Sequence, residues 1–223
     1  MELMFDCANL EQIATYQEIF AITGVTSNPT ILRPEGKIDF YPHLRAIREL
    51  IGPGRSLHVQ VVSQTAADIV AEAKRLRAAV GDDTYVKVPT TTPGLTAMRA
   101  LKADGANVTA TAIYARFQGF AAMQAGADYI APYVNRMENL DTDGIATIEW
   151  LARQIQRDGR PTKILAASFK NIGQVNAALD AGAHAVTVQP ALLADAFGFR
   201  ELQGAVEAFA ADWYAQFGTT ELP

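Results

Sequence analysis

The chain has 223 residues, 49% of them hydrophobic, so it can bury a sizeable core without disulfides or metal. Nineteen basic and 24 acidic residues give a net charge of -5, scattered along the chain, which argues against nucleic-acid or anionic-membrane partners. Its apolar runs are far shorter than the roughly 20 residues of a membrane helix. Cys7 is the single cysteine, and the apolar N-terminal stretch contains Glu2 and Asp6, unlike a secretory signal. We therefore expect a cytoplasmic protein.

Eight short apolar runs recur along the chain, and an amphipathic stretch follows most of them. Predicted strands cover residues 2–6, 24–27, 57–62, 84–88, 107–112, 128–133, 163–168 and 185–189. Predicted helices cover residues 9–21, 40–51, 65–80, 93–104, 115–125, 141–158, 171–181 and 191–197, with one further helix at about 200–217. The segment 29–40 is interpreted as an elaborated connection. This alternation predicts parallel strands joined by crossover helices.

Eight strand–helix units in a chain of this length match a (β/α)8 TIM barrel. An open doubly wound sheet usually has fewer strands. No linker or low-complexity segment interrupts the alternation. We therefore expect an α/β protein in which residues 1–223 form a single TIM-barrel domain with an additional C-terminal helix.

Polar residues stand at the ends of seven predicted strands, where the active site of such a barrel lies. They are Asp6, Thr26 with Asn28, Gln60, Lys87, Thr111, Tyr133 and Ser168. Side chains of a strand alternate between the barrel interior and the helix layer. This alternation turns Asp6, Gln60 and Lys87 inward and their valine and phenylalanine neighbours outward. The polar set is therefore predicted to converge on one mouth of the barrel.

Lys87 is the most informative of these residues, because an ammonium group inside a barrel is costly. Burial can lower a lysine pKa by up to about 3–5 units, and a protein's whole stability is only about 5–15 kcal/mol. A lowered pKa makes the amine a nucleophile that forms a Schiff base with a ketone or aldehyde. The alternative is a structural lysine that reaches solvent or pairs with Asp6.

The neighbouring polar residues each have more than one interpretation. Asp6 is a structural counter-ion, a general base or a group that orients substrate hydroxyls, and its position does not separate these roles. Tyr133 is either a packing residue or a proton-transfer group, the latter if it shares a water molecule with Gln60 and Thr111 near the imine.

A phosphate site is predicted at the late βα connections, where barrels of this type often bind phosphate. Arg136 is expected in a loop without a carboxylate partner, and Ser168 and Lys170 end the seventh strand. The alternative is that Arg136 and Lys170 are solvated surface residues.

Cys7 follows Asp6 by one position and should face the helix layer as an inert thiol.

No metal site is expected, because the three histidines show no paired spacing. They are His43, His58 and His184. The sequence also contains no glycine-rich nucleotide-binding loop of the Walker or dinucleotide type.

Six segments spread over the chain resemble, in order, the motifs of the small transaldolase family. They are FDCANLEQI, GVTSNPTI, YVKVPTTTPGLTAMRALKADG, TATAIY, GADYIAPYVNRM and ILAASFKN. The resemblance implies a (β/α)8 barrel and a class I aldol mechanism without metal or cofactor, with Lys87 as the Schiff-base lysine. It also implies binding and proton-handling roles for Asp6 and Asn28, beside Thr26, and a phosphate site at Arg136, Ser168 and Lys170.

Two residues distinguish branches of that family. Gln60 and Tyr133 resemble the fructose 6-phosphate aldolase branch, whereas transaldolases usually carry glutamate and phenylalanine there. The resemblance therefore implies an aldolase that cleaves a sugar phosphate. One alternative is a transaldolase that transfers dihydroxyacetone between sugar phosphates. A second alternative is a sugar-phosphate binding protein without catalytic activity. Cys7, where the family commonly has threonine, and the stretch MENLDTDG after Arg136 depart from the pattern.

The final predicted helix carries a bulky apolar stripe at steps of three and four residues. The stripe consists of Phe199, Leu202, Val206, Phe209, Trp213 and Phe217. It either packs against its own barrel or, as the resemblance implies, reaches over a neighbouring subunit in a homo-oligomeric pentamer or decamer.

Overall fold

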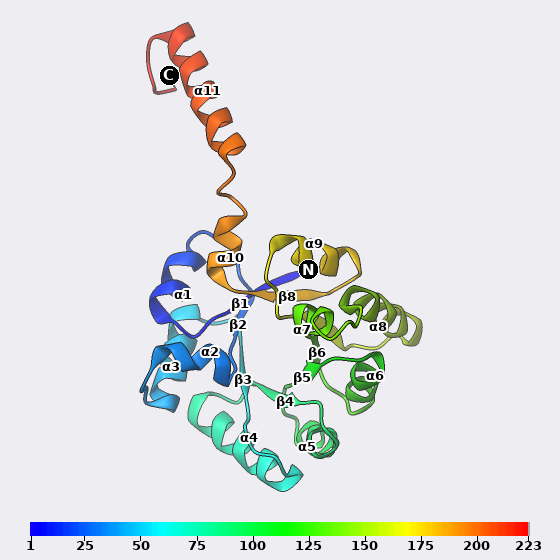
Figure 1. Cartoon of the computed structure of the whole chain (residues 1–223). Helices are drawn as coiled ribbons and strands as arrows, with labels where there is room; N and C mark the ends of the chain where they lie inside the picture. Colours follow the sequence, from blue (N-terminus) through cyan, green and yellow to red (C-terminus); the bar gives the residue numbers. More distant parts are fainter. Residues whose placement is uncertain (223) are drawn as a thin grey trace. The chain divides into compact units, whose positions relative to one another are not determined.

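The computed structural model describes residues 1–222, and their strands form a closed parallel barrel in chain order, β1 to β8 (Figure 1). The strands are β1 Glu2–Asp6, β2 Gly24–Thr26, β3 Ser56–Gln60, β4 Tyr85–Pro89, β5 Val108–Ile113, β6 Tyr129–Pro132, β7 Lys163–Ala166 and β8 Ala185–Val188. β1 pairs with β8, which closes the barrel. The predicted (β/α)8 architecture is confirmed.

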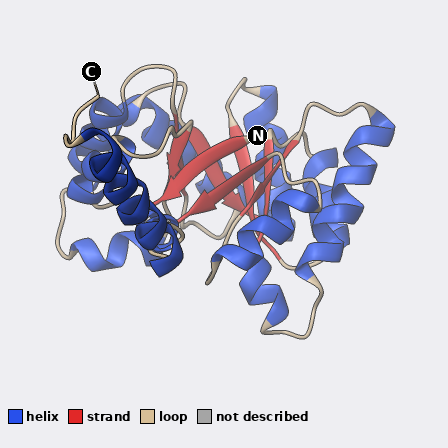
Figure 2. Ribbon diagram, turned by 90° about the horizontal axis from the view of Figure 1, so that it is seen from above, coloured by secondary structure: helices blue, strands red, loops and turns tan. Residues whose placement is uncertain are grey.

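Helices lie outside the strands, as Figure 2 shows for the barrel seen from another side. They are α1 Leu10–Gln17, α2 Pro29–Leu32, the 3-10 helix η1 Arg33–Glu35, α3 Phe40–Ile51, α4 Ala66–Val80, α5 Thr92–Ala103, α6 Arg116–Gln124, α7 Val134–Glu138, α8 Gly144–Asp158, α9 Ile172–Asp180, α10 Pro190–Asp195 and α11 Arg200–Phe217. All nine predicted helices occur. The short α2, η1 and α7 were not predicted, because one helical turn is too short to show a period.

The helix α4 shows how local sequence sets these boundaries. Thr65 precedes it, and the Thr65 hydroxyl accepts a hydrogen bond from the backbone N–H of Asp68, which caps the helix. Gly81 ends it with a φ of 148°, a conformation that side chains with a Cβ rarely adopt. Ile69 and Leu76 are buried on the inner face, so helical periodicity and the two end signals agree.

The chain divides into two compact units, one spanning Met1–Pro190 and one beginning at Ala191. The first holds the whole barrel, and the second holds α11 and most of α10. The expected single domain over 1–223 stays a prediction. Within residues 1–222 no helix combines the length and the hydropathy needed to cross a membrane.

Candidate active site

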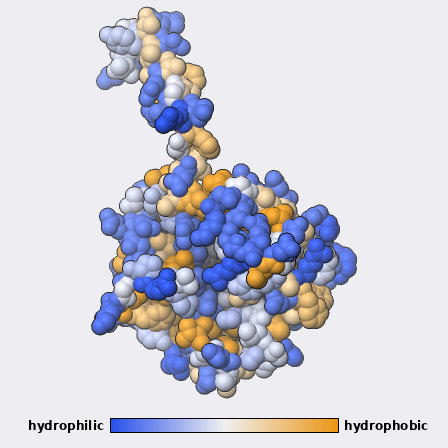
Figure 3. Space-filling view, viewed as in Figure 1, coloured by the Kyte–Doolittle hydropathy of each residue, from blue (hydrophilic) through white to orange (hydrophobic). Residues whose placement is uncertain are grey.

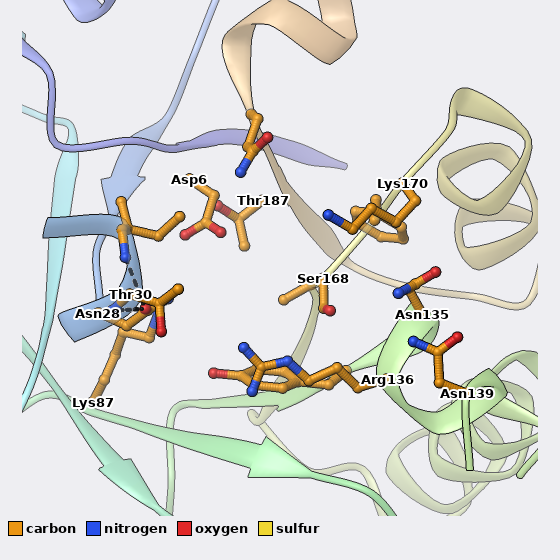
Figure 4. Close-up of a pocket in the computed structure, with 15 residues that line it drawn as sticks. Asp6, Asn28, Thr30, Lys87, Asn135, Arg136, Asn139, Ser168, Lys170 and Thr187 are labelled. Atoms are coloured by element: carbon orange, nitrogen blue, oxygen red, sulfur yellow. Dashed lines mark hydrogen bonds between the residues drawn. The ribbon is translucent and has the colours of Figure 1, made fainter. Parts of the chain in front are cut away.

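A cavity of about 290 Å³ opens at the carboxyl ends of the strands, where the sequence predicts the site. Seven of the ten expected site residues line it: Asp6, Asn28, Lys87, Tyr133, Arg136, Ser168 and Lys170 (Figure 4). Figure 3 shows hydrophilic residues gathered over the centre of this barrel face. The parallel strands thus bring together side chains that are far apart in the sequence.

Lys87 lies on β4, and only 3% of its surface is exposed. Its amine lines the cavity, and no hydrogen bond or ion pair joins it to Asp6 or to any other residue from 1 to 222. Burial lowers the pKa of Lys87, and the nearby charge of Asp6 opposes this shift. The amine therefore loses its proton more readily than an ordinary lysine and is available as a nucleophile.

Asp6 ends β1 and is held by a short chain of hydroxyl groups. The Thr26 hydroxyl donates to Asp6 Oδ1 at 2.8 Å, and the hydroxyl oxygens of Thr26 and Thr187 lie 2.8 Å apart. Since Thr26 uses its proton on Asp6, Thr187 donates to Thr26. Burial raises the pKa of Asp6, against the opposing effects of Lys87, Thr26 and Arg136. A carboxyl group with a raised pKa suits reversible proton transfer.

Thr111 and Tyr133 form a second hydroxyl pair, with Thr111 Oγ1 2.8 Å from Tyr133 Oη. The β5–β6 pairing shifts register between Ala110 and Ile113, and Ala112 has a φ of 56°. Such irregularities redirect side chains near active sites. The pKa of Tyr133 is raised mainly by burial, so its phenol stays protonated at neutral pH.

Asn28 is oriented by the start of α2, which it caps. Its Oδ1 accepts hydrogen bonds from the backbone N–H groups of Thr30, at 2.9 Å, and Ile31, at 3.1 Å. With the oxygen engaged in this way, the amide nitrogen of Asn28 remains as a donor at the cavity edge.

Arg136 lies in the short helix α7, so the expected loop is wrong at this position. The turn of helix forms because the backbone N–H of Met137 bonds to the carbonyl oxygen of Tyr133 at 2.9 Å. Arg136 Nη1 donates to Tyr114 Oη at 3.3 Å, and its guanidinium lies 4.9 Å from the centre of the Tyr133 ring. No carboxylate among residues 1–222 pairs with it. Its charge is therefore available to an anion.

Ser168 and Lys170 lie on the connection after β7, across the cavity from Lys87 (Figure 4). Ser168 has a φ of 64°, a left-handed conformation that costs on the order of 1–3 kcal/mol for such a residue. Its carbonyl oxygen accepts from the backbone N–H of Asn135 at 2.9 Å, and the N–H of Lys170 donates to Gln174 Oε1 at 2.7 Å. These bonds hold the connection against α7 and α9.

Gln60 is placed differently from the other expected residues. It pairs in register with Lys87, but its side chain lines a neighbouring hollow with Val62 and Glu72. No hydrogen bond links it to Thr111 or Tyr133, which bond to each other. The structure therefore brings two of the three expected water ligands together and leaves Gln60 beside them.

Five polar residues line the cavity that the sequence interpretation missed: Thr30, Asn135, Asn139, Thr187 and Gln189. Thr187 and Gln189 end the eighth apolar run, so the rule applied to the other seven strands would have found them. Asn135 belongs to the unpredicted helix α7 and Asn139 is its C-cap, and no periodic signal marks them.

Cys7 faces the helix layer, as expected. Its sulfur lies 3.8 Å from the carbonyl oxygen of Asn9 and 3.7 Å from Gln12 Oε1. Burial raises the pKa of the Cys7 thiol to about 11, so the thiol stays protonated at neutral pH. A protonated thiol outside the cavity fits a packing role.

Comparison with known proteins relates this arrangement to one family. The model of the family described as "Transaldolase/Fructose-6-phosphate aldolase" matches residues 3–219. A Streptococcus pneumoniae protein (strain ATCC 700669 / Spain 23F-1), named "Probable fructose-6-phosphate aldolase", is 51% identical over 214 residues. The match covers 96% of this chain and 96% of that protein.

Proposed function

Since the chain belongs to the transaldolase/fructose-6-phosphate aldolase family, we propose that it is a class I aldolase that reversibly cleaves fructose 6-phosphate. The products are dihydroxyacetone and glyceraldehyde 3-phosphate. One observation supports this most directly: a buried lysine amine, without a partner among residues 1–222, faces the cavity at the carboxyl ends of the strands. This is the group that Schiff-base chemistry requires.

The first step joins Lys87 to the substrate. Its neutral amine attacks the C2 ketone, and the resulting carbinolamine loses water to give a protonated imine. The attack requires the uncharged form of the amine, which the lowered pKa of Lys87 favours.

The second step breaks the bond between C3 and C4. A base removes the proton of the C4 hydroxyl, glyceraldehyde 3-phosphate leaves, and the bonding electron pair moves into the imine to form an enamine. We assign this base role to Asp6, while Asn28 and Thr26 orient the substrate and the carboxylate.

The third step releases dihydroxyacetone. The enamine is protonated at C3, water adds to the imine carbon, and the amine of Lys87 is regenerated. We assign the proton donor to Tyr133, whose phenol is protonated and held by Thr111 at 2.8 Å. Gln60, in register with Lys87, is proposed to help hold the attacking water.

An acceptor-free assay tests this proposal against transaldolase activity. With fructose 6-phosphate alone, in the presence of a metal chelator, we expect dihydroxyacetone and glyceraldehyde 3-phosphate in equal amounts. A transaldolase would instead release almost no free dihydroxyacetone, and added erythrose 4-phosphate would take up the dihydroxyacetone unit to give sedoheptulose 7-phosphate, with sustained release of glyceraldehyde 3-phosphate. No turnover under either condition would instead support the other alternative, a sugar-phosphate binding protein without catalytic activity.

Replacing Tyr133 with phenylalanine should shift the balance toward transfer. Tyr133→Phe removes the proposed proton donor while keeping the ring, so the enamine persists longer. We expect dihydroxyacetone release to fall about 10²-fold, the usual scale of acid–base catalysis, and transfer to erythrose 4-phosphate to fall less. Tyr214→Phe on α11, outside the cavity, is the control and should leave both rates unchanged. Equal losses in both reactions would contradict the assignment.

Arg136, Ser168 and Lys170 are proposed to bind the phosphate. In the synthetic direction, Arg136→Leu should raise the KM for glyceraldehyde 3-phosphate about 10- to 100-fold, because a hydrogen bond to a charged group contributes about 1.5–3 kcal/mol. The KM for unphosphorylated glyceraldehyde should stay the same. Arg153→Leu on α8, whose partner is Glu149, is the matched control. A parallel rise for both aldehydes would argue against phosphate binding.

We also propose that the protein is a cytoplasmic homo-oligomer, a pentamer or decamer. The apolar side chains of α11 and of its N-cap residue are largely exposed in the single chain, among them Phe199 at 63% and Phe209 at 71%. Exposed apolar patches of this kind often mark interaction surfaces. The molecular mass in solution decides this point, since a monomer would contradict the proposal.

A further inference from the structure

A buried histidine on β3 has no part in the chemistry proposed above. His58 is completely buried inside the barrel, where interiors are usually filled by branched aliphatic side chains. Both ring nitrogens have partners: Nδ1 lies 2.8 Å from Thr109 Oγ1, and Nε2 lies 2.9 Å from Ser56 Oγ. The imidazole therefore connects β3 directly to β5.

The partners of the two hydroxyl groups assign the tautomer of His58. Ser56 Oγ donates its single proton to the carbonyl oxygen of Thr23, at 3.3 Å. It therefore accepts from Nε2–H of His58, and Nδ1 accepts from the hydroxyl of Thr109. A neutral imidazole offers one donor and one acceptor, so this arrangement satisfies it completely.

The surroundings of His58 keep the imidazole uncharged. Tyr85 of β4 stacks on it at 4.4 Å, and Tyr129 of β6 meets it edge-on at 5.2 Å. Burial is the main cause that lowers its pKa well below the ordinary value, and the charges of Lys87 and Arg48 act in the same direction. Further away, Glu2 accepts a hydrogen bond from Tyr129 at 2.6 Å and so faces the tyrosine rather than His58.

The bridge between His58 and Thr109 lies at the base of Lys87. β4 runs between β3 and β5, and its Lys87 pairs in register with Thr109. His58 pairs with Tyr85, two residues before Lys87 on the same inward face of β4. The imidazole therefore crosses β4 on the inside of the barrel. It lies further from the cavity mouth than Lys87 does.

We propose that His58 is a positioning residue for Lys87: bonded to Thr109, its imidazole fills the barrel interior beneath the lysine and keeps water from the amine's inner side. This inference rests on the proposed role of Lys87 as the nucleophile. Access of water matters because a charged amine is stabilised by hydration, and burial is the cause that lowers the pKa of Lys87.

Removing the imidazole should therefore admit water at this place. His58→Ala leaves a space bordered by the hydroxyl groups of Thr109 and Ser56, and a buried water needs this kind of polar lining. The water would stabilise the charged form of Lys87, so the amine would titrate at higher pH. Each pH unit of that shift lowers the neutral fraction of the amine about tenfold at neutral pH.

The experiment titrates the Lys87 amine by NMR in the full chain, without substrate. We expect His58→Ala to move the midpoint upward by about one unit or more, with a matching loss of borohydride trapping at pH 7 that is recovered at alkaline pH. His58→Gln retains much of the volume and a partner for Thr109, so its midpoint should stay near that of the wild type. If the alanine variant does not fold, His58→Asn serves as the shorter substitution.

Tyr129→Phe is the matched control, because it alters the same interior and removes the bond to Glu2 but leaves the ring against His58. An unchanged midpoint in His58→Ala, or an equal shift in Tyr129→Phe, would overturn the inference and leave His58 a packing residue. The NMR titration needs no catalysis. A wild-type protein that traps no substrate therefore contradicts the proposed function, while the midpoints still decide the role of His58.

Discussion

Lys87→Met is expected to abolish cleavage of fructose 6-phosphate, a loss of about 10⁴-fold or more, as expected when a covalent nucleophile is removed. Methionine matches the shape of the lysine stem but cannot form an imine. Borohydride reduction in the presence of substrate should add the mass of the bound fragment to the wild-type peptide that contains Lys87, and nothing to the variant. The measurement is peptide mass spectrometry together with the acceptor-free assay.

Lys74→Met is a suitable control for that experiment, since Lys74 pairs with Asp104 on the surface and should not affect turnover. Retained cleavage in Lys87→Met, or mass added at a different lysine, would end the proposal.

The same Lys87→Met variant should be more stable than the wild type at neutral pH. The pKa of Lys87 is lowered in the folded protein below its ordinary value of 10.5, so the unfolded chain binds the proton more tightly. Folding therefore carries a penalty that is complete below the folded pKa and disappears as the pH rises toward 10.5. Denaturant unfolding at pH 7 and above pH 10 should show the gain of the variant shrinking as the pH rises.

Asp6→Asn is expected to lower kcat by about 10²- to 10⁴-fold, the range that general acid–base catalysis contributes. Asparagine keeps an oxygen that can accept from Thr26, so the local geometry should survive. The loss of the charge should lower the pKa of Lys87 further, because Asp6 is the group that opposes its decrease. Borohydride trapping should therefore persist while turnover fails.

The pH profile gives a second measurement on Asp6→Asn. Wild-type kcat/KM should rise with pH as Asp6 deprotonates, at a pH above the ordinary aspartate value of 3.8, because burial raises its pKa. The variant should lack this acid limb, whereas the surface variant Asp104→Asn should retain it. If trapping and turnover fall together in Asp6→Asn, Asp6 acts before imine formation and its assignment as the base for C3–C4 cleavage is wrong.

Much of the fold could be predicted because its signals are local and repeated. Each strand is an apolar run, and each major helix carries its own period and end signals, as in α4. Strand-end polarity then pointed to the mouth of the barrel, where Asp6, Asn28, Lys87 and Tyr133 do lie. That prediction needs only the shared direction of parallel strands, which follows from the alternation itself.

The directions of the side chains within the site could not be predicted from these local signals. The sequence did not reveal that Gln60 lies apart from the bonded pair of Thr111 and Tyr133, nor that the pairing of β5 with β6 shifts register beside Thr111. The left-handed Ser168 and the short helix around Arg136 likewise depend on bonds between β7, α7 and α9. One turn of helix and one strained residue leave no periodic trace.

By itself, the sequence determined the barrel and the lysine inside it through the spacing of its residues, and it indicated the family through the resemblance of its motifs. Only the tertiary structure decided which groups are held near that lysine: a carboxyl group bonded to the Thr26 hydroxyl, and a histidine ring bonded to Thr109. These contacts join strands far apart in the chain. They therefore depend on barrel closure and on the exclusion of water, which no single segment specifies.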